Sequence, residues 1–275
     1  KGFIMRLSRF VFLAAMFLAP FAGANAVIAH ESWLEPQQYQ VESGGDLKAD
    51  LKNGQNFAGS TLAYFKNNIV RFDMIMGETS VPVEGRLGNI PALATQAPAV
   101  DGLLVLVYQS TESSLKYSEW EKFLAFAEHK DFKTAETDHI AAGWPQEGFR
   151  EVYARYIKSL VGVGNGEGAD VVTGMETEFV ALTNPYSAAF DGTMQVQVLY
   201  QAQPRADAQV EIFHRDPKGE VVVTTTRTDD QGVASIPVTP GSEYLLDAVV
   251  LRPYAGDKDA LWETLWAALT FKVPE

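Results

Sequence analysis

Four histidines, His30, His129, His139 and His214, are the side chains of this chain best suited to binding a transition metal. The chain contains no cysteine, which excludes thiolate metal sites and cysteine nucleophiles. Imidazole nitrogen suits copper and nickel, and Cu(II) ranks highest among the divalent ions for a nitrogen-rich site. The position of each histidine therefore decides whether a site can form.

His30 follows the most hydrophobic stretch of the chain, in the run VIAHESWLEP at 27–36. Basic residues precede an apolar run at 10–19, and small residues follow it. This order is typical of a secretory signal peptide, and the apolar run is too short to cross a bilayer. We therefore expect a periplasmic or secreted protein with no membrane span after processing, residues 1–29 being the signal peptide.

Two cleavage sites fit the small-residue rule, after Ala26 and after Ala29. Cleavage after Ala29 makes His30 the mature N-terminus, where the α-amine and the imidazole chelate one metal. A second imidazole then completes an arrangement that suits Cu(II), and the α-amine deprotonates easily near neutrality. Cleavage after Ala26 leaves three residues before His30 and removes the amine chelate.

His129 and His139 lie in the run FAEHKDFKTAETDHIAAG at 126–143. Their spacing does not fit a metal pair on one helix, which needs ligands three or four positions apart, so they can meet a metal only through the tertiary fold. Nearby carboxylates offer oxygen ligands, and the alternative is two solvated histidines. His214 follows Ile212 at strand spacing and is interpreted as structural.

The first mature segment reads as β structure. Strand-like segments at 39–53, 67–76, 79–87 and 101–110 predict an N-terminal β-sandwich-like domain over 30–114. The last of these is apolar enough to be a central strand. The fold class predicted from the whole chain is mostly β with a helical insert, that is, α+β.

The helical insert, or connector, is predicted over residues 115–163. Ser118 is the expected N-cap of its first helix, with Glu121 completing a capping box. The run 147–164 carries an apolar stripe at helical spacing, with Arg155 and Lys158 on the opposite, polar side. A shorter helical piece is expected between these two.

A flexible, glycine-rich break at 164–170 predicts a domain boundary. Alternating segments follow it and predict an immunoglobulin-like or prealbumin-like sandwich over 171–275. The predicted strands are 194–201, 208–215, 220–228, 232–238, 243–253 and 266–273.

The formal net charge is −13 at pH 7. Such an acidic surface repels nucleic acid and anionic lipid, so we expect neither as a partner, and it is compatible with attracting cations. Carboxylate pairs are too common in so acidic a chain to indicate a glycosidase.

Seven ordered segments together resemble a family of exported bacterial proteins. They are AHESWLEP (29–36), GRLGNIPA (85–92), LKYSEWEKFLAFAEH (115–129), DHIAAGWPQEGFREVYARYIKSLVGVG (138–164), NPYSAAFDGTMQVQVLY (184–200), TDDQGVASIPVTPGSEYLLDAV (228–249) and WETLWAALTF (262–271). The family is domain of unknown function 4198, formerly labelled a nickel-transport (NikM-like) subunit. The resemblance covers essentially the whole mature chain.

This resemblance implies an exported protein associated with metal uptake, and it brings no established catalytic residues. His30, His129 and His139 lie inside the family-like segments, and His214 lies outside them. These three form the predicted metal site.

Three functions remain open from the sequence. The first is a non-catalytic periplasmic protein that binds copper or nickel and works with a metal transporter of the outer or inner membrane. The second is an immunoglobulin-like adaptor module for protein or glycan, without metal. The third, weaker alternative is a copper-dependent oxidoreductase.

Overall fold

The computed structural model describes residues 2, 30–256 and 259–275. The predicted signal peptide, apart from Gly2, and both predicted cleavage sites lie outside the described residues. The described residues form eighteen strands and two α-helices, so the predicted mostly β class is confirmed.

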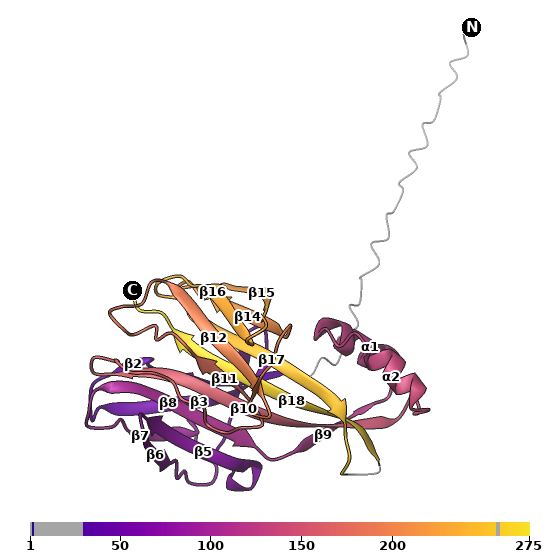
Figure 1. Cartoon of the computed structure of the whole chain (residues 1–275), viewed down its shortest axis with the longest axis horizontal. Helices are drawn as coiled ribbons and strands as arrows, with labels where there is room; N and C mark the ends of the chain where they lie inside the picture. The colour runs from indigo at the N-terminus through magenta and orange to yellow at the C-terminus, as the bar shows by residue number, and fades with distance from the viewer. Residues whose placement is uncertain (1, 3–29, 257–258) are drawn as a thin grey trace.

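The strands form three sheets (Figure 1). A first sheet contains β1 (Glu31–Pro36), β3 (Asp46–Gln55), β4 (Ala58–Leu62) and β7 (Leu93–Gln96). A second contains β11 (Thr177–Ala181), β12 (Thr193–Tyr200), β13 (Gln203–Pro204) and β16 (Val233–Pro237). The third sheet has ten strands. Eight of them follow one another in the order β15 (Val221–Arg227), β14 (Gln209–Arg215), β17 (Glu243–Pro253), β18 (Ala260–Lys272), β10 (Phe149–Val163), β8 (Gly102–Ser110), β5 (Ile69–Met76) and β6 (Thr79–Pro82). The short strands β2 (Gln40–Val41) and β9 (Ser113–Tyr117) also pair with β10. A short 3-10 helix, η1 (Lys66–Asn68), precedes β5.

The central strands of the ten-stranded sheet are buried on both faces, between the two smaller sheets. Successive residues of a strand point to opposite faces, and in β8 Leu103 and Val105 enter the core shared with β11 and β12. Leu104 and Leu106 enter the core shared with β1 and β3. This double burial explains why β8 reads as a continuous apolar run.

Strand β10 corrects the sequence prediction, because residues 149–163 are a strand and not a helix. Ala154, Tyr156 and Leu160 face one core, and Ile157 and Val161 face the other. An apolar run that is buried on both faces satisfies helical and strand spacing equally well, and its β-branched and aromatic residues favour the strand. The predicted helical insert over 115–163 is therefore helical only at 120–129 and 135–141.

The two helices lie at one end of the sheets (Figure 1). Helix α1 (Trp120–His129) begins after Glu119, with no side-chain cap, so the predicted capping box from Ser118 is wrong; the helix begins one residue later than that box requires. Helix α2 (Ala135–Ala141) confirms the shorter helical piece. Both helices pack on the ten-stranded sheet through a third core that includes Trp262 and Trp266 of β18.

Residues 171–275 contribute strands to two facing sheets, as the predicted sandwich requires. One of those sheets also contains β5, β6 and β8 from the N-terminal region, with β10 pairing in parallel to β18. The two predicted β domains thus share a sheet. The boundary at 164–170 stays a prediction.

Candidate functional site

A group of buried charged side chains lies on one face of the ten-stranded sheet, between the start of β1 and the end of α1. Glu31 is the first residue of β1, and Lys130 follows directly after α1. Glu211 on β14 and Asp247 on β17 are partners in the antiparallel ladder, so their side chains lie side by side. Four elements that are distant in the sequence therefore build one site, which we call the acidic cluster.

Lys130 occupies the centre of this cluster. Its Nζ lies 3.3 Å from Glu31 Oε1 and 2.9 Å from Asp247 Oδ2, and it donates a short hydrogen bond to Glu211 Oε2. The four side chains are at most 5% exposed. The three carboxylates each present an oxygen within 4.8 Å of the others, a spacing that could hold a metal ion. In this structure an ammonium lies among them.

The electrostatics follow from this packing. Burial lowers the pKa of Lys130, but the charges of the three carboxylates outweigh it, and the net pKa is raised. Burial raises the pKa of Asp247 to about 6 against the opposing effect of Lys130. Burial also acts to raise the pKa of Glu211, but hydrogen bonds from His129 and the charge of Lys130 bring it below its ordinary value.

Arg155 adds a second cation beside the cluster. Its guanidinium lies 4.3 Å from the centre of the Trp266 ring and 5.0 Å from that of Tyr153. It donates a 2.6 Å hydrogen bond to the carbonyl oxygen of His30, while its other terminal nitrogen, Nη1, is buried without a hydrogen-bond partner. Burial lowers the pKa of Arg155. Stacking of this kind stabilises a buried arginine.

Two of the predicted metal ligands, His30 and His129, adjoin the acidic cluster. His30 is exposed and precedes Glu31, and its carbonyl is held by Arg155. His129 precedes Lys130, and its Nε2 lies 2.9 Å from Glu211 Oε1. The hydrogen bond to Glu211 raises the pKa of His129. The side chain of His129 is 43% exposed, so its ring is open to solvent on the outer side.

A sequence profile described as "Domain of unknown function (DUF4198)" matches residues 27–252. The chain belongs to the DUF4198 family. No curated protein matches it.

Three solved structures resemble this DUF4198 protein at low TM-scores. The D0-D1 domain of intimin has a TM-score of 0.21 and 15% identity, and the alignment covers 87% of this chain and 97% of that one. A tetra-tandem repeat from the extending region of a large adhesion protein has a TM-score of 0.19 and 12% identity, and the alignment covers 89% of this chain and 50% of that one. The adhesin InvE of Yersinia pseudotuberculosis has a TM-score of 0.21 and 11% identity, and the alignment covers 88% of this chain and 60% of that one.

His139, the third predicted ligand of this DUF4198 protein, is fully buried and lies apart from the acidic cluster among aromatic rings. Its Nδ1 accepts a 3.0 Å hydrogen bond from Trp262 Nε1, and its Nε2 lies 3.0 Å from the carbonyl oxygen of Pro145. Burial lowers the pKa of His139. Both ring nitrogens are thus occupied, and the ring ties α2 to β18.

His214 stacks on Tyr244, with ring centres 4.9 Å apart. It lies on β14, beyond Glu211 along the strand, and its Nε2 is buried without a hydrogen-bond partner. This placement among packed strands agrees with the structural interpretation of His214.

Sequence reasoning missed the buried charged residues near the two histidines, namely Glu31, Lys130, Arg155, Glu211 and Asp247. One signal was present, because Glu211 and Asp247 each interrupt an apolar strand, in QVEIFHR and EYLLDAVVLRP. An acidic residue at such a position is buried and must have a charged or hydrogen-bonding partner. The identity of that partner comes from the tertiary fold alone.

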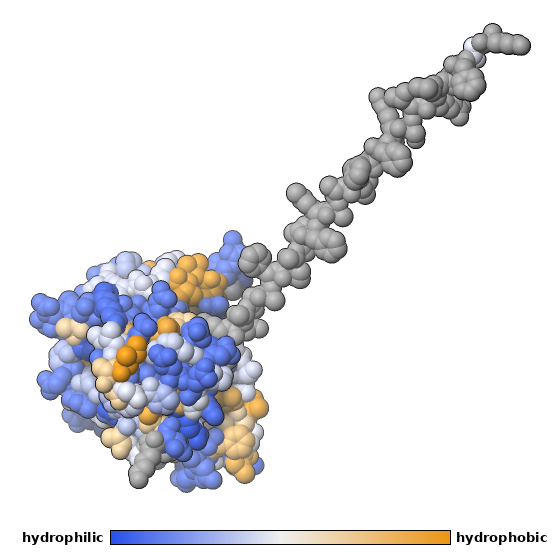
Figure 2. Space-filling model, turned by 90° about the vertical axis from the view of Figure 1, so that its right-hand side faces the viewer, coloured by the Kyte–Doolittle hydropathy of each residue, from blue (hydrophilic) through white to orange (hydrophobic). Residues whose placement is uncertain are grey.

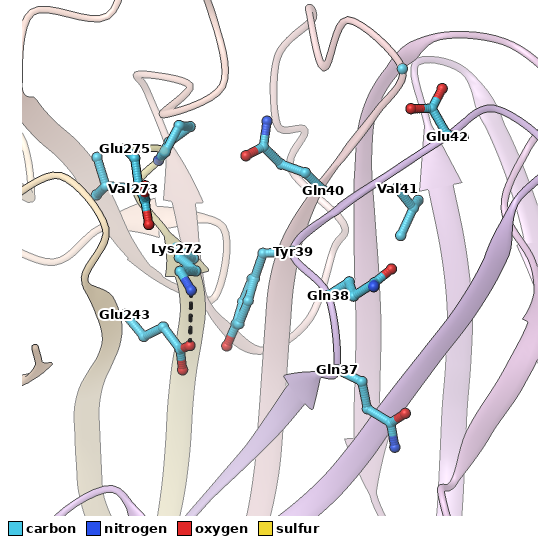
Figure 3. A pocket seen from close by; sticks show the side chains of 12 residues that line it. Gln37, Gln38, Tyr39, Gln40, Val41, Glu42, Glu243, Lys272, Val273 and Glu275 are labelled. Carbon is cyan, nitrogen blue, oxygen red and sulfur yellow. Dashed lines mark ion pairs between the residues drawn. The ribbon is translucent and has the colours of Figure 1, made fainter. Parts of the chain in front are cut away.

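A separate polar hollow of about 620 Å³ lies between the segment after β1 and the C-terminal residues (Figure 3). Tyr39 and Lys272 line it, and Lys272 pairs with Glu243 on the neighbouring strand. None of the predicted ligands lines it. Glutamines line one side of the hollow and carboxylates are also present, but its lining contains no imidazole, the ligand that copper and nickel favour.

The surface at the helical end is mostly hydrophilic, with small scattered hydrophobic patches (Figure 2). Ile140 of α2 is one of the exposed hydrophobic residues of the described chain. Within the described residues, neither helix is long and apolar enough to cross a membrane.

Proposed function

We propose that this DUF4198 protein acts outside the cytoplasm as a non-catalytic binding protein for a divalent transition metal, with His129 and His30 as ligands. The observation that carries the proposal is the hydrogen bond between His129 Nε2 and Glu211 Oε1. It places a histidine, half open to solvent, directly against a buried carboxylate.

This hydrogen bond favours one form of the imidazole. Glu211 has a lowered pKa, so its carboxylate accepts and Nε2 of His129 carries the proton. In the neutral ring the lone pair is then on Nδ1, the atom that would bind the metal, and the metal must displace the proton that the raised pKa of His129 retains. A carboxylate behind a metal-binding histidine orients the ring and raises its basicity, and such pairs recur in metal sites.

His30 supplies further nitrogen. The hydrogen bond from Arg155 fixes its main chain beside the cluster. When His30 is the first residue of the mature protein, its α-amine and imidazole chelate one ion, as the sequence predicted. Nitrogen ligands of this kind favour Cu(II), followed by Ni(II).

The acidic cluster contributes charge. Three carboxylates face the two cations Lys130 and Arg155, which leaves one negative charge in excess before His129 is counted. This excess lowers the energy of a cation at the rim of the cluster. We propose that the captured ion is handed to a metal transporter, as the family resemblance implies.

Calorimetric titration of the mature protein with Cu(II) and with Ni(II) tests the proposal. We expect a dissociation constant below about 10 μM for at least one ion, a free energy of about −7 kcal/mol or better. His129→Ala should weaken binding by 10-fold or more, since one ligand and its supporting carboxylate contact are lost. His214→Ala is the matched control, because His214 does not contact the cluster, and it should leave the affinity unchanged.

The mature N-terminus separates the two versions of the site. Intact mass gives the cleaved bond. A protein that begins at His30 should bind Cu(II) more tightly than one that begins at Val27, because only the first has a free amine on His30. Binding weaker than about 10 μM for both ions and both forms would reject the proposal.

A second candidate function is the adaptor module. Strand β15 ends the ten-stranded sheet, and its Val222 and Val223 are 56% and 40% exposed. An exposed edge strand rich in β-branched residues can add a strand from another chain. The test is selection from a random peptide library: extended peptides that lose binding to Val222→Lys would support it, and the absence of any selected peptide would reject it.

A further inference from the structure

Lys158 of β10 lies on the opposite face of the ten-stranded sheet from the acidic cluster, beside Asp170 and Glu178. The side chains of Lys158 and Asp170 are 0% exposed and that of Glu178 is 1% exposed. The surrounding core is apolar and includes Tyr156 and Leu160, the neighbours of Lys158 on the same face of β10. A lysine and two carboxylates are therefore sealed together away from water.

The lysine nitrogen lies against the carboxyl group of Asp170. Nζ is 2.6 Å from Oδ1 and 2.8 Å from Oδ2. Because both oxygens are so close, the carbon between them lies about 3 Å from the nitrogen, within the range of a reactive contact. The nitrogen thus contacts both oxygens of one carboxyl group, and it also donates a 2.9 Å hydrogen bond to the carbonyl oxygen of Val171.

The carboxyl oxygens of Asp170 also accept main-chain hydrogen bonds. The N–H of Val171 donates to Oδ1 at 2.7 Å, and the N–H of Ala181 donates to Oδ2 at 2.8 Å. Fixed donors in this position stabilise negative charge that develops on a carbonyl oxygen. The arrangement therefore suits addition to the carboxyl carbon as well as an ion pair.

Glu178 is in position to move a proton. Its Oε2 lies 3.7 Å from Lys158 Nζ. Its carboxylate is held by the N–H and the hydroxyl of Thr173, at 2.9 and 2.7 Å, and by the N–H of Gly174 at 2.9 Å. A fixed carboxylate this close to the lysine nitrogen can act as a general base and then as a general acid.

We propose that Lys158 and Asp170 form an intramolecular isopeptide bond, with Glu178 as the proton carrier. The bond closes a loop that spans the glycine-rich break at 164–170 and ties it to β10. Nothing in the proposed metal site takes part in it.

The reaction starts by proton transfer from the Lys158 ammonium to the Asp170 carboxylate, which burial favours because a neutral pair replaces two buried charges. Burial also raises the pKa of Asp170. The amine nitrogen then attacks Cγ, the C–N bond forms, and the carbonyl electron pair moves to oxygen beside the Ala181 N–H. Glu178 takes a proton from the nitrogen and gives it to the leaving hydroxyl. The C–O bond breaks and one water leaves, so an ammonium and a carboxylate become an amide plus water.

Lys130 provides an internal control in the same chain. Its Nζ meets single oxygens of three different carboxylates, so it does not face one carboxyl carbon as Lys158 does. The three surrounding carboxylates also raise its pKa and keep it an ammonium. We expect Lys130 to remain a free amine.

Mass spectrometry of the full chain, unfolded in denaturant, tests the proposal. The expected mass is lower than that of the mature sequence by one water. A lysine-specific protease should not cut after Lys158, giving a fragment 134–218 that lacks one water, while it should cut after Lys130. Backbone fragment ions between positions 158 and 170 should be missing, because the loop is closed there.

Glu178→Gln should fold with the same circular dichroism, show the full mass and be cut after Lys158. Lys158→Arg should show the full mass, since a guanidinium is not a nucleophile. Wild-type protein with the full mass and complete cleavage after Lys158 would overturn the proposal and leave a buried ion pair. A water loss that maps to another residue would overturn the assignment to Asp170, and a cross-linked Glu178→Gln would overturn the role of Glu178.

Discussion

Lys130 is the residue on which the acidic cluster depends most. Removing one partner from a buried charge network leaves the others uncompensated, at a cost of about 3–5 kcal/mol. Lys130→Met should therefore lower the free energy of unfolding by about that amount, measured by urea denaturation in metal-free buffer. Lys133→Met is the control, because the Lys133 side chain is 70% exposed and its replacement should change stability by about 0.5 kcal/mol or less. Equal stability of the two variants would show that Lys130 does not hold the cluster together.

Glu151 predicts a pH dependence of stability. It is buried, bonded to Tyr117 and Thr264, and burial raises its pKa to about 7 from an ordinary 4.5. The folded state therefore binds more protons than the unfolded state between these values, and stability falls as pH rises through that window. The whole shift corresponds to roughly 3 kcal/mol.

Glu151→Gln has no such proton to lose. The free energy of unfolding should therefore fall by roughly 3 kcal/mol less between pH 4.5 and 7 than in wild type. Urea denaturation across this range measures it. Glu121→Gln, at an exposed position of α1, should keep the wild-type curve. If the free energies of unfolding of Glu151→Gln and wild type changed equally with pH, the raised pKa of Glu151 would be contradicted.

For individual residues, the sequence predicted part of the candidate site. The histidines were visible as scarce metal-binding side chains, and His30 and His129 do lie next to cluster residues. The carboxylates were hidden because thirty-five acidic residues offer no way to choose among them. The partner of a buried charge is set by which strands meet, and no local pattern contains that information.

Among the elements, β10 explains the largest difference between sequence and structure. Its polar residues Arg155 and Lys158 read as the solvent side of a helix, but each is buried on a different face of a strand. Charged side chains are rarely buried unless they are paired, so local periodicity placed them in solvent. Strands buried on one face, such as β12 and β16, alternate clearly and were predicted well.

Helix α2 gives a prediction that separates structure from metal binding. His139→Ala removes two hydrogen bonds and leaves the Trp262 N–H and the Pro145 carbonyl without that partner. We expect a loss of about 2–4 kcal/mol in unfolding free energy, from unpaired polar groups and a cavity between aromatic rings. The affinity for Cu(II) should stay at the wild-type value. A variant with wild-type stability and weakened Cu(II) binding would restore His139 as a ligand.

The whole molecule brings the residues of the acidic cluster together from the start, the middle and the last third of the chain. The ten-stranded sheet makes this possible, because β14 and β17 present Glu211 and Asp247 on the face where β1 begins and α1 ends. The sequence predicted the β content and the position of both helices. It could not predict that strands from both halves share one sheet, since pairing between distant strands leaves no local signal.

The most direct test of the metal proposal is anomalous diffraction from crystals of the mature protein loaded with Cu(II). The account predicts a copper peak about 2 Å from His129 Nδ1, the usual length of a metal–imidazole bond, and within reach of His30. Crystals at saturating copper with no peak beside His129, or with peaks only elsewhere, would contradict it.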